Sequence, residues 1–248
     1  MWKKYWIIIG LLFCLSIGLQ AKSLQADYDV SYGVFGKIGV AKARLKEEGY
    51  HYEIEIKLAA TGLAKTLSGN RKERHVSRGH FQNGVLVSDT YEVTREYRHT
   101  KVVKRYTIDH LHKVVRKDYR KFKNGTLVDE QQETLSFYAP NDLLTLYFNL
   151  DRLLPDKHKA GTYNFKAVGA EKQQGEVSIE IPSAKLLPSF KSDLGAGAAW
   201  YATVIIHQKI FMSKEGRLEI AVGKDGITQT ALLKDLILFG DIKAVRIR

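Results

Sequence analysis

The sequence predicts a mainly β protein, built as a single curved antiparallel sheet or half-open β-barrel with one buried central helix. Two observations predict the strands: apolar and polar residues alternate with a period of two over many segments, and Gly, Asn-Gly or Asp-Gly sequences separate those segments. A third observation predicts the helix. Residues 143–154 are apolar on nearly every side and end at a proline, which is typical of a buried helix.

The first three strands alternate most clearly. In residues 28–34 the side chains of Tyr28, Val30 and Tyr32 share one face, and residues 41–45 and 50–58 repeat the pattern. Glycines between these segments predict hairpin turns, so the three strands form a meander. Acidic residues on the polar face of the third strand, such as Glu53 and Glu55, are expected to pair with basic neighbours in a solvated ladder.

Further strands are predicted along the rest of the chain. Asn124-Gly125 and Asp225-Gly226 are strong two-residue hairpin signals between such strands. The predicted strands cover residues 84–97, 100–109, 112–123, 126–136, 177–181, 200–212, 218–222 and 227–233.

The central helix follows Pro140, and Asn141 is its predicted N-cap. Pro155 ends it. Because its side chains are apolar nearly all round, the simplest architecture holds this helix in the concave face of the curved sheet. Its inward side chains are then candidates for lining an apolar pocket: Leu143, Leu146, Tyr147, Phe148 and Leu150.

The N-terminus has the pattern of a secretion signal. Lys3 and Lys4 precede an apolar run over residues 7–19, and Ala21 follows. The run is shorter than the roughly 20 residues that a transmembrane helix needs. We therefore predict a signal peptide over residues 1–21, removed on export, and a single β-rich periplasmic domain over residues 22–248. Cys14, the single cysteine, lies in the signal, so the exported chain has no disulfide and no thiol ligand.

The chain is strongly basic, with a net charge of +12, and residues 95–123 hold much of that charge. In the periplasm such a charge favours binding to phospholipid headgroups and other envelope anions, including contact with an anionic membrane surface. Nucleic acid is excluded as a partner because it is normally absent from this compartment. One interpretation is an anion-binding ribbon. The other is a solvated sheet face whose charges discourage edge-to-edge pairing. The candidate headgroup contacts are Arg95, Arg98, Lys101, Lys104, Arg105, Arg116, Lys117 and Arg120.

Several segments also resemble a known family. They are residues 28–45 with the Gly36–Gly39 turn, Thr61-Gly62-Leu63, residues 77–81 before Asn83-Gly84, residues 141–148, and residues 213–218 followed by Asp225-Gly226. Together they resemble the bacterial exported family catalogued as domain of unknown function 3108. The resemblance implies a β-rich protein of the Gram-negative envelope and brings no catalytic residue with it. The basic stretch over residues 95–123 departs from the family pattern.

No motif in the sequence assigns a reaction. The chain has no Gly-x-Ser-x-Gly elbow, no His-Glu-x-x-His and no phosphate loop. His110 and His112 are predicted to share one face of a strand, yet a metal site needs a third ligand, so exposed histidines beside Lys and Arg are the simpler interpretation. We predict no metal and no cofactor, and leave enzymatic activity uncertain.

Three functions stay open. The first is a non-enzymatic envelope protein that binds a lipid or another hydrophobic or anionic envelope ligand in its concave sheet. The second is a scaffold or assembly protein that docks another envelope protein while the helix plugs the concavity. The third is a hydrolase of envelope glycans or lipids, which a buried acid within hydrogen-bond reach of a His or Ser would favour. Ligand identity, protein partner and oligomeric state do not follow from the sequence.

Overall fold

The computed structural model describes residues 22–207, 216–236 and 240–248, and it places all described strands in one 14-stranded sheet. The predicted signal peptide lies outside the described residues. The strands are β1 (Lys22–Tyr32), β2 (Lys37–Glu48), β3 (His51–Ala60), β4 (Lys72–Gln82), β5 (Val85–Tyr97), β6 (Thr100–Asp109), β7 (Val114–Lys123), β8 (Thr126–Thr134), β9 (Gly161–Lys166), β10 (Glu176–Ile181), β11 (Trp200–Ile205), β12 (Arg217–Val222), β13 (Thr228–Leu236) and β14 (Gly240–Arg246).

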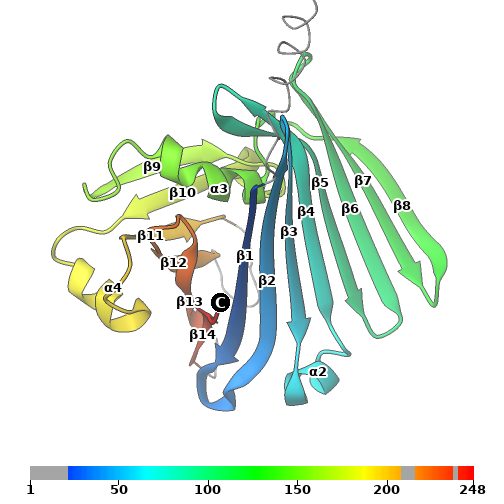
Figure 1. The fold of residues 1–248 in the computed structure, drawn as a ribbon. Coiled ribbons are helices and arrows are strands. Elements are labelled where there is room, and N and C mark those ends of the chain that lie inside the picture. Colours follow the sequence, from blue (N-terminus) through cyan, green and yellow to red (C-terminus); the bar gives the residue numbers. More distant parts are fainter. Residues whose placement is uncertain (1–21, 208–215, 237–239) are drawn as a thin grey trace, which may run out of the picture.

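Short helices join some of these strands (Figure 1). They are the 3₁₀ turns η1 (Gly33–Phe35) and η2 (Gln173–Gly175) and the α-helices α2 (Gly62–Leu67), α3 (Leu143–Leu153) and α4 (Leu187–Leu194). No helix among the described residues is long and apolar enough to cross a bilayer.

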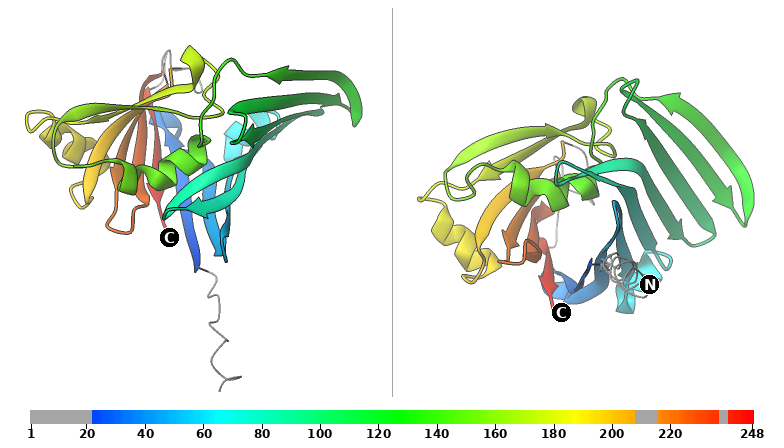
Figure 2. Two further views of the ribbon diagram at one scale, coloured as in Figure 1. Left: turned by 90° about the horizontal axis from the view of Figure 1, so that it is seen from above. Right: turned by 45° about the horizontal axis from the view of Figure 1, so that its top comes forward.

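Two antiparallel meanders meet in the middle of the sheet. The strand order is β8-β7-β6-β5-β4-β3-β2-β1-β14-β13-β12-β11-β10-β9, so β1 pairs with β14 and the edges are β8 and β9. The sheet curls until its two halves face one another across α3, while β6–β8 extend outwards from the barrel (Figures 1 and 2). The prediction of a mainly β, curved antiparallel sheet around a buried helix is confirmed.

Alternation identified the faces of the first strands correctly. Ala43 lies between Ala26 and Ile56 in register, with the charged neighbours of all three on the opposite face. The acidic ladder is also present, since Glu53 binds Arg78 at 2.7 Å and Glu55 is ion-paired as well. These strands therefore have one apolar face and one charged face, as half-buried strands require.

The predicted Asn124-Gly125 hairpin is confirmed, whereas the predicted strand position of His110 and His112 is wrong. Asn124 and Gly125 join β7 to β8 with positive φ at both residues (50° and 81°), the hairpin geometry that Asn-Gly favours. His110 and His112 do not share a strand face. They lie in the turn between β6 and β7, because β6 ends at Asp109 and β7 begins only at Val114.

Other segments differ from the predicted elements. β4, β9 and β14 were not predicted, and β11 ends at Ile205, whereas the prediction continued to residue 212; residues 208–212 lie outside the described part. The N-cap of α3 is Asp142, not Asn141, because the Asp142 carboxylate accepts the backbone N–H groups of Leu144 and Thr145.

The helix α3 divides the interior between two core clusters. Leu144 packs with side chains of β2–β7, whereas Leu146 and Leu150 pack with those of β10–β12. On the opposite face of β11–β13, Phe190 and Leu194 of α4 form a third cluster. The core therefore lies where α3 spans the two halves of the barrel.

A short stretch of β5 has no strand partner on one side, because β6 pairs with β5 only from Thr90 onwards. Side chains and loops take the place of that strand. Asn149 of α3 accepts the backbone N–H of Leu86 at 3.0 Å and donates to the Leu86 carbonyl at 2.8 Å, while the Ser88 N–H donates to the Pro140 carbonyl. The buried backbone groups are thus satisfied, and α3 is fixed to the sheet.

Candidate functional site

The predicted headgroup residues do not gather on one surface. Strand alternation divides them between two faces and a turn. Arg95, Lys104 and Lys117 lie on the face that continues the barrel interior; Lys101, Arg105, Arg116 and Arg120 lie on the opposite face; and Arg98 lies in the turn between β5 and β6.

Several of these cations already have acidic partners. Arg120 binds Glu130 at 2.7 Å, and Arg95 binds Glu73 at 3.3 Å. On the same inner face as Arg95, burial alone would raise the pKa of Glu73, but hydrogen bonds from His75 and the charges of nearby arginines lower it to about 2. Anion binding by residues 95–123 therefore stays a prediction, and the cations that would carry it lie on two faces of the sheet.

A further group of ion pairs joins the outer strands to the other half of the barrel. Glu171 follows β9 and reaches β6 and β7, where its carboxylate lies 2.7 Å from Lys104 Nζ and 2.9 Å from Lys117 Nζ, and accepts the Tyr106 hydroxyl. Burial raises the pKa of Glu171, but these hydrogen bonds outweigh it and lower the pKa to about 2. Glu171 thus fastens β6 and β7 to the loop after β9.

The predicted pocket residues on α3 divide into two groups. Leu146 and Leu150 are buried in the core and are not open to a ligand. Leu143, Tyr147 and Phe148 are only partly buried. The Tyr147 hydroxyl accepts the Thr228 N–H at 2.8 Å, so this residue also fastens α3 to β13.

A concave apolar face lies beyond the part of the barrel that α3 fills. The inward residues of β1–β3 form rows across the sheet, and the row Leu24–Leu45–Ile54 packs in the same cluster as Leu144 of α3. The next rows carry small and aliphatic side chains that stay half-buried. This concave apolar face consists of Val30, Ala41, Ala43, Ile56 and Leu58 on β1–β3 and of Ala231, Ile242 and Ala244 on β13 and β14.

Small residues occupy several positions of this face. Where a barrel is filled by its own side chains, large residues meet at its centre. Here Ala41 stands between Tyr28 and Leu58, and Val30 stands between Gly39 and Ala244. The partial exposure of these inward side chains shows that solvent reaches them inside the curved sheet.

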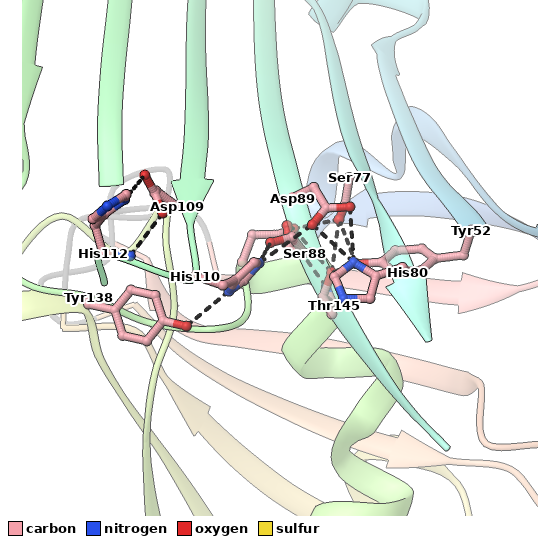
Figure 3. A network of polar contacts seen from close by, with 11 residues as sticks. Tyr52, Ser77, His80, Ser88, Asp89, Asp109, His110, His112, Tyr138 and Thr145 are labelled. Carbon is pink, nitrogen blue, oxygen red and sulfur yellow. Dashed lines mark hydrogen bonds and ion pairs between the residues drawn. The ribbon is translucent and has the colours of Figure 1, made fainter. Parts of the chain in front are cut away.

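A buried polar network holds α3 at the other end of the barrel (Figure 3). The Asp142 carboxylate accepts hydrogen bonds from the hydroxyls of Ser77 (2.5 Å), Ser88 (2.6 Å) and Thr145 (3.1 Å), besides the two capped N–H groups. Tyr52 joins the network through Thr145 at 2.7 Å. Burial raises the pKa of Asp142, and the hydrogen bonds oppose that shift.

The backbone of β4 must pass close to this network. A Cβ atom at Gly79 would overlap the Val87 carbonyl oxygen and lie 2.8 Å from the Tyr52 hydroxyl. Only glycine leaves room for β4 and β5 to bring Ser77 and Ser88 onto the same carboxylate. A β-bulge lies here, because Arg78 pairs with Thr90 and Gly79 pairs with Ser88, which leaves Asp89 as the extra residue of β5. Ser88 therefore binds Asp142, while Asp89 binds His80.

A second, more exposed chain of polar groups starts at Asp89. His80 Nδ1 lies 3.0 Å from the Asp89 carboxylate and therefore donates to it. His110 Nε2 lies 2.9 Å from the Ser88 carbonyl and therefore donates to it, and its Nδ1 lies 2.9 Å from the Tyr138 hydroxyl. These contacts fasten the β6–β7 turn and the segment before α3 to β5.

These contacts bear on the hydrolase alternative, because a buried acid does lie within reach of two serines. Both serine hydroxyls and the carboxylate are fully buried, and no described histidine contacts either hydroxyl. A Ser–His–Asp relay needs an imidazole between hydroxyl and carboxylate and a path for substrate. The Asp142 network in the described structure meets neither condition and acts as the anchor of α3.

Comparisons with known proteins find a similar solved structure but no matching family model. No protein-family model and no curated protein matches the chain. Among solved structures it is similar to the crystal structure of a β-barrel-like protein of domain of unknown function 1849 from Brucella abortus, with 9% sequence identity, a TM-score of 0.48, and coverage of 90% of this chain and 95% of that chain. That neighbour, like the family that the sequence resembles, is a domain of unknown function.

Proposed function

We propose that the protein is a non-enzymatic, periplasmic envelope protein whose open barrel holds the acyl chain of a lipid or a similar hydrophobic ligand. The concave apolar face supports this best, because its inward side chains are half-buried and most of them, Ala41 and Leu58 among them, belong to neither core cluster that contains α3 residues. Apolar surface left in water is unfavourable by roughly 25 cal/mol per Å², so a ligand that covers this face stabilises the protein. The signal-like N-terminus and the family resemblance support the compartment.

The two alternatives have less support. A scaffold whose concavity is plugged by its helix requires α3 to cover the inner rows of β1–β3, yet the core clusters that contain α3 residues include Leu24, Leu45 and Ile54 and omit Ala41 and Leu58. A hydrolase requires a reactive group open to substrate, which the buried Asp142 network does not offer.

Strand alternation offers a matched pair of variants for the test. Ala41 lies on the concave face and Lys42, the next residue, on the charged outer face. We expect Ala41→Phe to fill the space beside Tyr28 and Leu58 and to weaken binding of a fluorescent long-chain fatty acid about tenfold or more, since each displaced CH₂ contact is worth about 0.8 kcal/mol. Lys42→Phe should leave binding unchanged.

The measurement is a titration of the purified chain with the fatty-acid probe, with palmitate as competitor. Circular dichroism of each variant checks the fold. A wild-type protein that binds no probe, and that carries no lipid mass in native mass spectrometry, would remove the ligand-binding proposal. Equal weakening by both variants would place the binding elsewhere.

A further inference from the structure

Two connections at one end of the barrel expose large apolar side chains. In η1, between β1 and β2, Val34 is 89% exposed and Phe35 is 55% exposed although it stacks on Tyr32. In α2, between β3 and β4, Leu63 is 83% and Leu67 is 81% exposed. Both connections lie at the lower end of the sheet in Figure 1, and we call these four residues the tip.

The structure holds the two leucines outwards. The Thr61 N–H donates to the Ile38 carbonyl at 2.8 Å, and the Lys65 N–H donates to the Thr61 carbonyl at 3.2 Å, so α2 is attached to β2 at its first turn. Leu63 and Leu67 are four residues apart and therefore share one helix face. That face points away from the sheet, as the exposure of both side chains shows.

Basic residues surround the tip. Lys65 lies between the two leucines, Lys72 begins β4, and Arg98 packs its side chain against Gly69 just after α2. Lys37, at the start of β2, is paired with Asp29. Lys65 and Lys72 are exposed and form no ion pair with any residue that the structure describes. The tip thus combines apolar side chains with cations that are available to an anionic partner.

We infer that the tip docks on the surface of a bilayer that contains anionic phospholipids. Leucine and phenylalanine side chains on short protruding turns enter the headgroup boundary, and lysines beside them contribute about 1 kcal/mol each near an anionic surface. A protein partner fits less well. A stable interface buries about 800 Å² per partner around a packed apolar core, whereas these four side chains stand on two separate connections.

The tip also lies at the end of the concave apolar face that is farther from α3. Along β3 the chain runs from Tyr52, beside α3, through Leu58 to the connection that forms α2, and β1 runs through Val30 to η1. A docked tip therefore brings this end of the concave apolar face to the bilayer. With the tip docked, a lipid would enter the barrel from the bilayer at this end. That route rests on the proposed function, whereas membrane docking by the tip does not.

The test is flotation of the chain from Lys22 onwards, which contains every described strand, with vesicles. Vesicles of phosphatidylglycerol and phosphatidylethanolamine are compared with vesicles of phosphatidylcholine. We expect binding to the anionic vesicles, weakened by salt, and a loss of about tenfold or more in the L63S/L67S double variant. Lys65→Glu should also weaken binding to the anionic vesicles.

Matched controls come from the opposite end of the barrel. Leu111 is 85% exposed in the β6–β7 turn, and Lys224 is exposed in the β12–β13 connection. Leu111→Ser and Lys224→Glu should bind vesicles as the wild type does. As a direct readout, Leu67→Trp should shift its fluorescence to shorter wavelength with anionic vesicles, because the indole enters the interface.

Two outcomes would overturn the inference: a wild-type protein that floats with neither kind of vesicle, and tip variants that float as well as the controls. If L63S/L67S instead loses a cross-link to an envelope protein while vesicle binding is unchanged, the tip is a protein-docking surface. Titration of the same variants with the fluorescent fatty acid keeps the two proposals separate, since tip variants should bind that probe normally in solution.

Discussion

At Glu171 a single carboxylate joins strands that are distant in sequence, and its pKa of about 2 makes the contact sensitive to pH. The ordinary pKa of this group is 4.5, so its value is lower in the folded state. Its contribution to stability is therefore complete above about pH 4.5 and is lost as the pH falls towards 2. We expect Glu171→Gln to lower the free energy of unfolding by about 2 kcal/mol at pH 7 and by almost nothing near pH 2.

Urea denaturation at both pH values checks this expectation. Glu133→Gln is the matched control, because Glu133 binds the same Lys117 at 2.8 Å but is 56% exposed. Its loss should be well under 1 kcal/mol. A pH-independent difference between the Glu171 variant and the wild type would show that packing, and not the ion pair, carries the effect.

The polar network around Asp142 was only partly predictable from the sequence. Position 142 was recognisable as part of a helix start, since Asn141 and Asp142 are both good N-caps. Geometry then selected Asp142, because its carboxylate also accepts the hydroxyls of Ser77 and Ser88 from β4 and β5. Those serines carry no apolar or catalytic pattern in the sequence, so nothing there marks them as partners of a helix cap.

Among the elements, α3 determines how much of the barrel is filled. Leu146 is 3% exposed and packs with β10–β12, whereas Phe148 is half-buried against Tyr147. We expect Leu146→Ala to cost about 2–5 kcal/mol, with no recovery on adding an envelope lipid extract, because it leaves a cavity in the sealed core. Phe148→Ala should cost less and should reduce the stabilisation that the lipid gives.

Thermal melts of both variants, with and without the lipid extract, measure the difference. Asp151→Ala is the control on the same helix, since Asp151 is exposed and pairs only with Lys157 in the described structure. Equal losses in the two core variants, with no effect of lipid on either or on the wild type, would indicate that Phe148 is also part of a sealed core.

Elements with a strong apolar period were predictable, and the others were not. β4 was missed because its buried positions include Ser77 and Gly79, which the apolar pattern does not register. β9 was missed because none of its side chains is fully buried, which leaves it without a strong apolar pattern. The outer strands β6–β8 were predicted, with Asn124-Gly125 as the hairpin signal between the last two. The two-residue period of a strand also explains why the predicted basic ribbon is divided, because it sends successive residues to opposite faces.

At the scale of the whole molecule, alternation identifies the faces of strands but not their neighbours. The pairing of β1 with β14 brings Tyr28 opposite Arg246 and joins the two meanders in the middle of the sheet, which no local pattern in either strand predicts. The half-open shape follows from that pairing together with α3, which satisfies the free edge of β5 and leaves β8 and β9 as edges.

This topology predicts how protection against hydrogen exchange is distributed. The first strand of the fold is central, since β1 is bonded to both β2 and β14, whereas β8 pairs only with β7 and is exposed along nearly its whole length. Edge strands open locally, while central strands exchange only when large parts of the molecule unfold. We expect amides of Tyr28–Tyr32 to exchange about a hundredfold more slowly than those of Thr126–Thr134, measured by mass spectrometry after pulsed deuteration. Similar rates in both segments would mean that β1 and β14 separate as easily as the edge strand β8, contrary to a sheet whose two meanders are firmly joined by that pairing.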